Sequence, residues 1–103
     1  MIVVRMEFQA KWNQSDRVVA GFTENADLMR KILGPEIHMR ILTDLSGPFF
    51  TVVQEFEVPS LAEWERVRTK IFTNPEIQEA VSEIEDNPFM SGRTEYYTLE
   101  AVY

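Results

Sequence analysis

The chain has 103 residues, 45% of them hydrophobic, and its 17 acidic and 10 basic side chains give a formal net charge of -7. A chain of this length hides only roughly two-thirds of its unfolded surface, so we expect residues 1–103 to form one domain with one modest core. The negative charge repels phosphate backbones and anionic lipids, which argues against a nucleic acid or a membrane as a partner.

The chain contains no cysteine, which excludes disulfides, a thiol nucleophile and metal sites built on sulfur. Its other residues form no metal or cofactor signature, so we expect neither a metal nor a cofactor. The opening stretch carries Arg5 and Glu7 among alternating apolar residues, a pattern typical neither of a signal peptide nor of a spanning helix. We therefore expect a cytoplasmic protein.

Residues 2–10 alternate between two kinds of side chain and predict a strand with one buried face. The apolar side of that strand holds Ile2, Val4, Met6 and Phe8. Apolar residues then recur at three- and four-residue steps, which predicts a helix from Asp16 to Leu33 that a Gly-Pro pair terminates. Gly21 should destabilise this helix by about 1 kcal/mol relative to Ala at the same position. A helix that starts only near Thr23 is the alternative.

The stretch from Ile37 to Val58 indicates two strands joined by a segment with Gly47 and Pro48, the composition of a β-hairpin. Because side chains alternate along a strand, one face of the hairpin is apolar and should hold the helices. This face carries Ile37, Met39, Ile41, Phe50, Val52, Phe56 and Val58, with Gln54 as its one polar member. The other face is mixed and carries His38, Arg40, Leu42, Phe49, Thr51, Val53, Glu55 and Glu57.

Two helical segments are expected next. Ser60 with Glu63 three residues later forms a capping box, which predicts a helix over residues 61–72. An Asn-Pro pair at residues 74–75 then starts a second amphipathic segment, which should end near residues 87–88. The expected buried residues are Leu61, Trp64, Val67, Ile71 and Phe72 in the first segment and Ile77, Ala80, Val81 and Ile84 in the second.

The last strand is predicted from Arg93 to Tyr103, after a loop from Phe89 to Gly92, with Tyr96 on the mixed face of the sheet. The resulting order of elements is typical of the α+β, ferredoxin-like βαββαβ fold, a four-stranded antiparallel sheet with helices on one face. The second face is too apolar for plain solvent and too polar for a core. We therefore expect it to pair with a second copy of the chain.

Residues 43–80, TDLSGPFFTVVQEFEVPSLAEWERVRTKIFTNPEIQEA, combine a strand, a Gly turn, a second strand, a Ser-capped helix with Trp64 and an Asn-Pro break. In this the chain resembles the dimeric α/β-barrel superfamily, most of all its NIPSNAP-like members and next the antibiotic-biosynthesis-monooxygenase-like group. The resemblance implies a homodimer that pairs two sheets as a dimeric α/β barrel. It also implies a pocket between sheet and helices or within the barrel.

For function, the resemblance implies an uncharacterised NIPSNAP-like protein that binds a small hydrophobic molecule in a pocket of the barrel. The alternative is a cofactor-independent monooxygenase or isomerase that acts on an aromatic or polyketide-like compound. Haem-degrading relatives use an Asn, a Trp and a His that lies on a helix as iron ligand. Trp64 matches their Trp, but the one histidine, His38, falls on a predicted strand, so the chain departs from that pattern.

Histidine is the side chain that exchanges protons near neutral pH, so a general base is expected at His38. Arg40 and Glu55 on the same face would orient it and hold an anionic or enolic oxygen of a substrate. The ligand itself is expected to contact Trp64, Tyr96 and Thr51. The alternative is structural: His38 is a half-exposed strand residue, the charged residues fix the register of a dimer, and Trp64 belongs to the core.

Overall fold

The structure is a computed structural model that describes residues 1–82 and 87–103. Within these ranges, antiparallel strands form one four-stranded sheet. In sheet order the strands are β2 (His38–Thr43), β3 (Thr51–Val58), β1 (Ile2–Ala10) and β4 (Phe89–Thr98). Two central strands are thus flanked by β2 and β4 as edges, which is the sheet of the predicted ferredoxin-like α+β fold.

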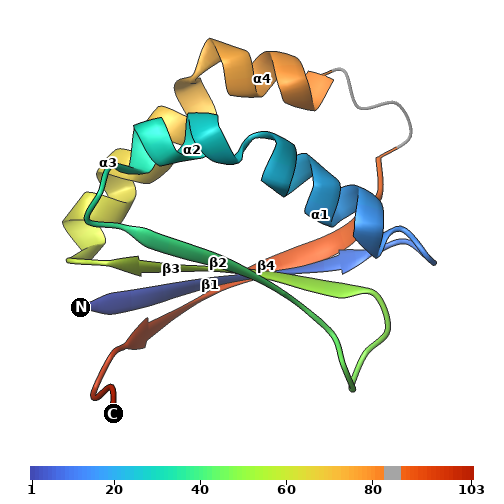
Figure 1. The fold of residues 1–103 in the computed structure, drawn as a ribbon, viewed down its shortest axis with the longest axis horizontal. Coiled ribbons are helices and arrows are strands. Elements are labelled where there is room, and N and C mark those ends of the chain that lie inside the picture. Colours follow the sequence, from blue (N-terminus) through green and yellow to red (C-terminus); the bar gives the residue numbers. More distant parts are fainter. Residues whose placement is uncertain (83–86) are drawn as a thin grey trace.

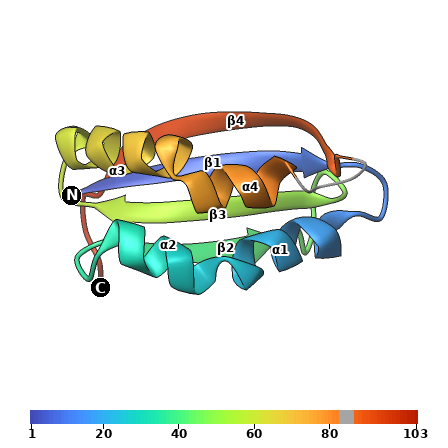
Figure 2. The same ribbon diagram turned by 90° about the horizontal axis from the view of Figure 1, so that it is seen from above.

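The helices of the described ranges cover one face of this sheet, and no described helix lies on the other face (Figures 1 and 2). They are α1 (Ser15–Glu24), α2 (Ala26–Leu33), α3 (Leu61–Thr73) and α4 (Pro75–Ser82). None of them is both long enough and apolar enough to cross a membrane. Below, "helix face" means the covered side of the sheet and "open face" means the other side.

Strand register confirms the predicted faces of the hairpin. Phe56 on β3 lies opposite both Val4 and Met39, and all three point toward the helices. Glu55 lies opposite both Arg5 and Arg40 on the open face. The fully buried core on the helix side forms two clusters. One contains Val4, Leu33, Ile37, Phe56, Val58, Trp64 and Val67, and the other contains Ala10, Val18 and Val52.

The predicted single helix from Asp16 to Leu33 is wrong, because the structure divides it at Asn25 into α1 and α2. The backbone of Asn25 leaves the helical region, with φ -101° and ψ 13°, and its side-chain Nδ2 donates to the carbonyl of Gly21 at 2.8 Å. Asparagine competes with the helix in this way for backbone groups. The alternative start near Thr23 is also wrong, since α1 begins at Ser15.

The expected caps of α3 and α4 are confirmed. The Ser60 hydroxyl accepts from the backbone N–H of Glu63 at 3.2 Å, and Asn74 Oδ1 accepts from the N–H groups of Glu76 and Ile77 at 2.9 and 3.2 Å. Two expected core residues of α3 are not buried: Leu61 is 53% exposed and Phe72 is 57% exposed. The side chain of Val81 and the position of Ile84 lie outside the described residues, whereas residues 87–88, near which the segment was expected to end, are described and are not helical.

The last strand also differs from the prediction. It runs from Phe89 to Thr98 instead of from Arg93 to Tyr103, and the expected loop before it is already paired with β1. Tyr96 lies opposite Val4, which places its side chain on the helix face, while Tyr97 lies on the open face. The prediction had Tyr96 on the open face. Because Tyr96 and Tyr97 are adjacent and of the same type, the alternation of side chains did not show which of them faces the helices.

Candidate functional site

The six residues expected to form one site lie on the two faces of the sheet. Trp64 on α3 and Tyr96 on β4 belong to the helix side, where both line a cavity. His38, Arg40, Thr51 and Glu55 belong to the open face, on the edge strand β2 and on β3. Since the backbone of the sheet lies between the two groups, one small molecule cannot contact both. The structure therefore offers two separate candidate sites.

The cavity lies between the helix face and the helix layer and has a volume of about 500 Å³. Seven of its described wall residues are aromatic, and these are Phe8, Phe22, Phe56, Trp64, Phe72, Phe89 and Tyr96. Aliphatic and small residues, among them Met6, Val18, Gly21, Met29, Ile71, Ile77 and Ala80, complete most of the wall. Each element of the helix layer contributes to this wall, so the cavity forms only when the helices are in place.

Two buried polar side chains belong to the wall. Gln54, 6% exposed, donates from Nε2 to the sulfur of Met39 at 3.3 Å, and a thioether is a weak acceptor. Trp64, 3% exposed, has its indole nitrogen buried without any hydrogen-bond partner among the described residues. A buried donor without an acceptor costs about 1–3 kcal/mol. The polar groups at the bottom of the cavity are therefore not fully satisfied by the protein.

Several aromatic rings of the wall pack against one another. Phe8 stands 5.4 Å from both Phe22 and Phe89, measured between ring centroids. Its ring can lie across β4 because Gly92 has no side chain: a Cβ at that position would be 3.3 Å from Phe8 Cδ1. Phe56 and Trp64 form a second pair at 5.0 Å. The wall is thus built in part from tilted pairs of aromatic rings.

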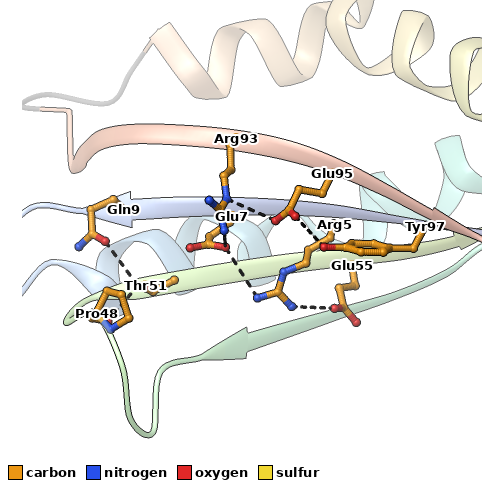
Figure 3. A network of polar contacts seen from close by, with 9 residues as sticks. All are labelled: Arg5, Glu7, Gln9, Pro48, Thr51, Glu55, Arg93, Glu95 and Tyr97. Atoms are coloured by element: carbon orange, nitrogen blue, oxygen red, sulfur yellow. Dashed lines mark hydrogen bonds and ion pairs between the residues drawn. The ribbon is translucent and has the colours of Figure 1, made fainter.

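The open face carries a network of ion pairs that crosses all the described strands of the sheet, and Figure 3 shows its part on β1, β3 and β4. The carboxylate of Glu55 forms ion pairs with the guanidinium of Arg40 at 2.6 Å and with that of Arg5 at 3.1 Å. Arg5 also stands 3.8 Å from Glu7, and Glu7 accepts from Arg93 at 3.1 Å. Three arginines thus alternate with carboxylates across neighbouring strands, as expected for cross-strand pairs that fix register. A further described ion pair, at 3.3 Å, joins Arg93 to Glu95.

The network ends at Tyr97, whose hydroxyl donates to Glu95 Oε2 at 2.6 Å. This hydrogen bond lowers the pKa of Glu95, with smaller contributions from the charges of Arg93 and Arg5. The same hydrogen bond raises the pKa of Tyr97. An open depression of about 490 Å³ lies over this region and is lined mainly by the charged side chains of the network. Its charged side chains and the hydroxyl of Tyr97 already have partners.

His38 and Thr51 lie outside this network. His38 is exposed on β2, opposite Glu57, and no described hydrogen bond or ion pair joins it to Arg40 or Glu55. Thr51 is buried at the start of β3, where its hydroxyl donates to the carbonyl of Pro48 at 2.9 Å and its backbone N–H donates to Asp44 Oδ1 at 3.0 Å. Thr51 thus closes the hairpin turn. Among the described residues no cluster of carboxylate or imidazole groups could hold a metal ion.

The sequence prediction missed most of the cavity. Phe8 and Phe56 were expected on the apolar faces of their strands, and Arg17, Arg68 and Thr94 were given no role, yet all five share one wall. An available signal was the single polar residue, Gln54, on the apolar face of the hairpin. A buried amide on an otherwise apolar surface usually has a partner or a polar space near it.

No protein-family model and no curated protein sequence matches the chain. Solved structures do match its fold. A NIPSNAP-like domain protein from Burkholderia xenovorans has a TM-score of 0.85 at 18% identity, over 99% of this chain and 87% of that chain. The haem-degrading protein MhuD from Mycobacterium tuberculosis has a TM-score of 0.76 at 9% identity, over 100% and 99%.

A Deinococcus radiodurans protein assigned to the antibiotic-biosynthesis monooxygenases gives a TM-score of 0.67 at 12% identity, over 100% of this chain and 96% of that chain. At such low identities the likeness concerns the fold. It confirms, at that level, the resemblance to NIPSNAP-like proteins and to the monooxygenase group that residues 43–80 predicted.

Proposed function

We propose that the protein binds a small, hydrophobic, largely aromatic molecule in the cavity between the sheet and the helices. The observation that carries this proposal is the wall of the cavity. Its volume of about 500 Å³ lies within the roughly 300–1,000 Å³ of small-molecule sites, and its aromatic lining matches their usual composition. Protein interiors are otherwise close-packed, so a sequence selected only for a stable core would fill such a space.

The unsatisfied donor of Trp64 supports the same proposal. The indole nitrogen itself is buried. A ligand oxygen beside Trp64 would therefore accept a hydrogen bond from the indole N–H only after a small rotation of the ring. Tyr96, 51% exposed, adds a hydroxyl farther out in the wall. Trp64 and Tyr96 are thus the proposed ligand contacts, whereas Thr51 faces the other side of the sheet.

The test uses Gly21, which lines the cavity within α1 and at which an added Cβ meets nothing within 4 Å. A Gly21→Leu variant places a branched side chain in the space and removes a helix-weakening glycine. We expect the wild-type protein to bind the fluorescent probe N-phenyl-1-naphthylamine saturably and the variant to bind it at least tenfold more weakly, with unchanged or higher thermal stability.

The matched control is Thr23→Leu, which adds the same side chain at an exposed position of α1 that does not line the cavity. It should bind the probe as the wild type does. Absence of saturable binding to the wild type, or equal binding by Gly21→Leu, would contradict the proposal.

We further propose that two copies pair through their open faces as a dimeric α/β barrel. This face has no described helix over it, and half-buried apolar residues such as Val3 accompany the ion pairs. Light scattering after size exclusion should give twice the 12.0 kDa mass of one chain. A Leu42→Lys variant, which places a charge on the exposed edge of this face, should shift the mass toward one chain without loss of probe binding.

A second candidate function, a cofactor-independent monooxygenase or isomerase for aromatic or polyketide-like compounds, would use the depression on the open face that Arg40 and Glu55 line. In the oxygenase reaction the substrate anion supplies the electrons, one oxygen atom enters the substrate and the other leaves as water. His38, Arg40 and Glu55 would then act from the open face, inside a dimeric barrel. Oxygen uptake with a polycyclic phenol tests this activity, and unchanged turnover in His38→Ala would remove His38 as the base.

MhuD holds two haems in its active site. In this chain the one imidazole of the sequence, His38, lies on the open face, so it cannot reach a haem in the cavity. The residues present therefore do not fit a histidine-ligated haem there, and we assign the cavity an organic ligand without iron. The cytoplasmic location expected from the sequence stays a prediction.

A further inference from the structure

One cation in the wall of the cavity has no carboxylate partner among the described residues. Arg68 on α3 is exposed, and none of the described ion pairs involves it. It follows Trp64 by four residues, so both side chains lie on the same face of the helix. Arg68 is thus placed between solvent and the buried part of the wall.

The guanidinium of Arg68 is held by an aromatic ring. Its Cζ lies 5.2 Å from the centroid of Phe72, which also lines the cavity. A cation above an aromatic face is attracted by the ring, and this contact keeps the planar donors of arginine near the ligand space. Arg17 from α1 contributes a second guanidinium to the wall.

No Asp or Glu belongs to the described part of this wall. This is unexpected in a chain whose net charge of -7 disfavours anions in general. A guanidinium forms short, charge-assisted and often bidentate hydrogen bonds with acidic oxygens. The described part of the wall therefore carries cationic but no anionic side chains, although the whole chain is negative.

We propose that the ligand of the cavity is an aromatic acid: a flat apolar ring system that bears one anionic group, such as a carboxylate or a sulfonate, which Arg68 binds at the rim. This inference rests on the proposed function, because it assigns the chemical class of the molecule that fills the cavity. The rings of the ligand lie among the aromatic side chains, and the acid points toward solvent.

The test compares two probes with the same ring system. 8-Anilinonaphthalene-1-sulfonate carries an anionic group, and N-phenyl-1-naphthylamine lacks it. In fluorescence titrations of the full chain, Arg68→Gln should weaken binding of the sulfonate about fivefold, equivalent to about 1 kcal/mol for an ion pair at a surface. Binding of the neutral probe should be unchanged.

The matched control is Arg66→Gln on the same helix. Arg66 is paired with Glu63 at 2.8 Å and does not line the cavity, so this variant should bind both probes as the wild type does. The inference about the acid would be overturned if both variants weakened binding of the sulfonate equally, or if Arg68→Gln did not change binding of the sulfonate. Saturable binding of the neutral probe in that case would leave the proposed function standing, whereas no binding of either probe would overturn both.

Discussion

The two faces of the sheet differ in whether their polar side chains have hydrogen-bond or ion-pair partners. On the open face, the charged side chains satisfy one another: Glu55 alone is shared by Arg5 and Arg40. On the helix face, the few buried polar groups are left with weak partners or none, as with Gln54 and the indole of Trp64. Space and unmet hydrogen bonds thus occur together on the helix face, whereas most of the charged side chains of the open face are joined to one another by the described ion pairs.

The largest expected effect tests whether the helix face is the stabilising one. Phe56 is 1% exposed and packs on Trp64, so Phe56→Ala should lower the free energy of unfolding by about 3–5 kcal/mol. Glu57 is its neighbour on the open face, and Glu57→Ala should lower the free energy of unfolding by less than about 0.5 kcal/mol. Urea denaturation followed by circular dichroism measures both, and similar costs would show that the two faces do not differ in this way.

A smaller effect is expected at Asn74, whose side chain caps the helix α4 that covers part of the cavity. Asn74→Ala should lower the free energy of unfolding by about 1 kcal/mol. Asn74→Ser keeps a hydrogen-bond acceptor and should lower it by only a few tenths of a kcal/mol. Hydrogen exchange should become faster in α4 and stay unchanged in β2. Faster exchange in both elements would mean that the helix layer and the open edge of the sheet unfold together.

On the open face, Glu55→Gln removes the carboxylate that two arginines share. Because Arg40 is well exposed, we expect a loss of at most about 1 kcal/mol in unfolding free energy, and a smaller loss in 1 M salt. Glu57→Gln, on the same strand and face, has no described ion pair and serves as control. A loss of several kcal/mol that salt does not reduce would show that this network is buried and structural.

The smallest effect concerns the hydrogen bond between Tyr97 and Glu95. Because it lowers the pKa of Glu95, its contribution to stability is present above the ordinary pKa and is lost as the pH falls through the lowered value. Because it raises the pKa of Tyr97, the contribution is also lost above about pH 10. Tyr97→Phe should raise the pKa of Glu95 in a carboxyl NMR titration, and an unchanged value would exclude the bond in solution.

Sequence reasoning succeeded where local chemistry decides the structure. The alternation of β1 and of the hairpin gave the correct faces, and Ser60 and Asn74 marked the starts of α3 and α4. It failed on β4, and the cavity explains why. The residues of β4 that face the helices include Thr94 and Tyr96, which border a space instead of a packed core, so they lack the apolar pattern of a buried strand.

The candidate site was predicted in part for a related reason. Trp64 and Tyr96 were chosen as ligand contacts and do line the cavity, but the sequence does not say how the helices are spaced over the sheet. His38, Arg40 and Glu55 were grouped because they share a strand face, which the register bears out. Whether residues on one face enclose a space depends on what covers them, and nothing local in the sequence encodes that.

Gly92 gives the cavity an adjustable dimension. One added carbon at this position would come within 3.3 Å of the Phe8 ring, so the ring would have to move by a few tenths of an ångström. Since Phe8 is part of the wall and Gly92 is not, a side chain at position 92 would change the shape of the cavity from outside it, on an exposed edge strand. Relatives or engineered variants that differ only there would be expected to prefer ring systems of different width.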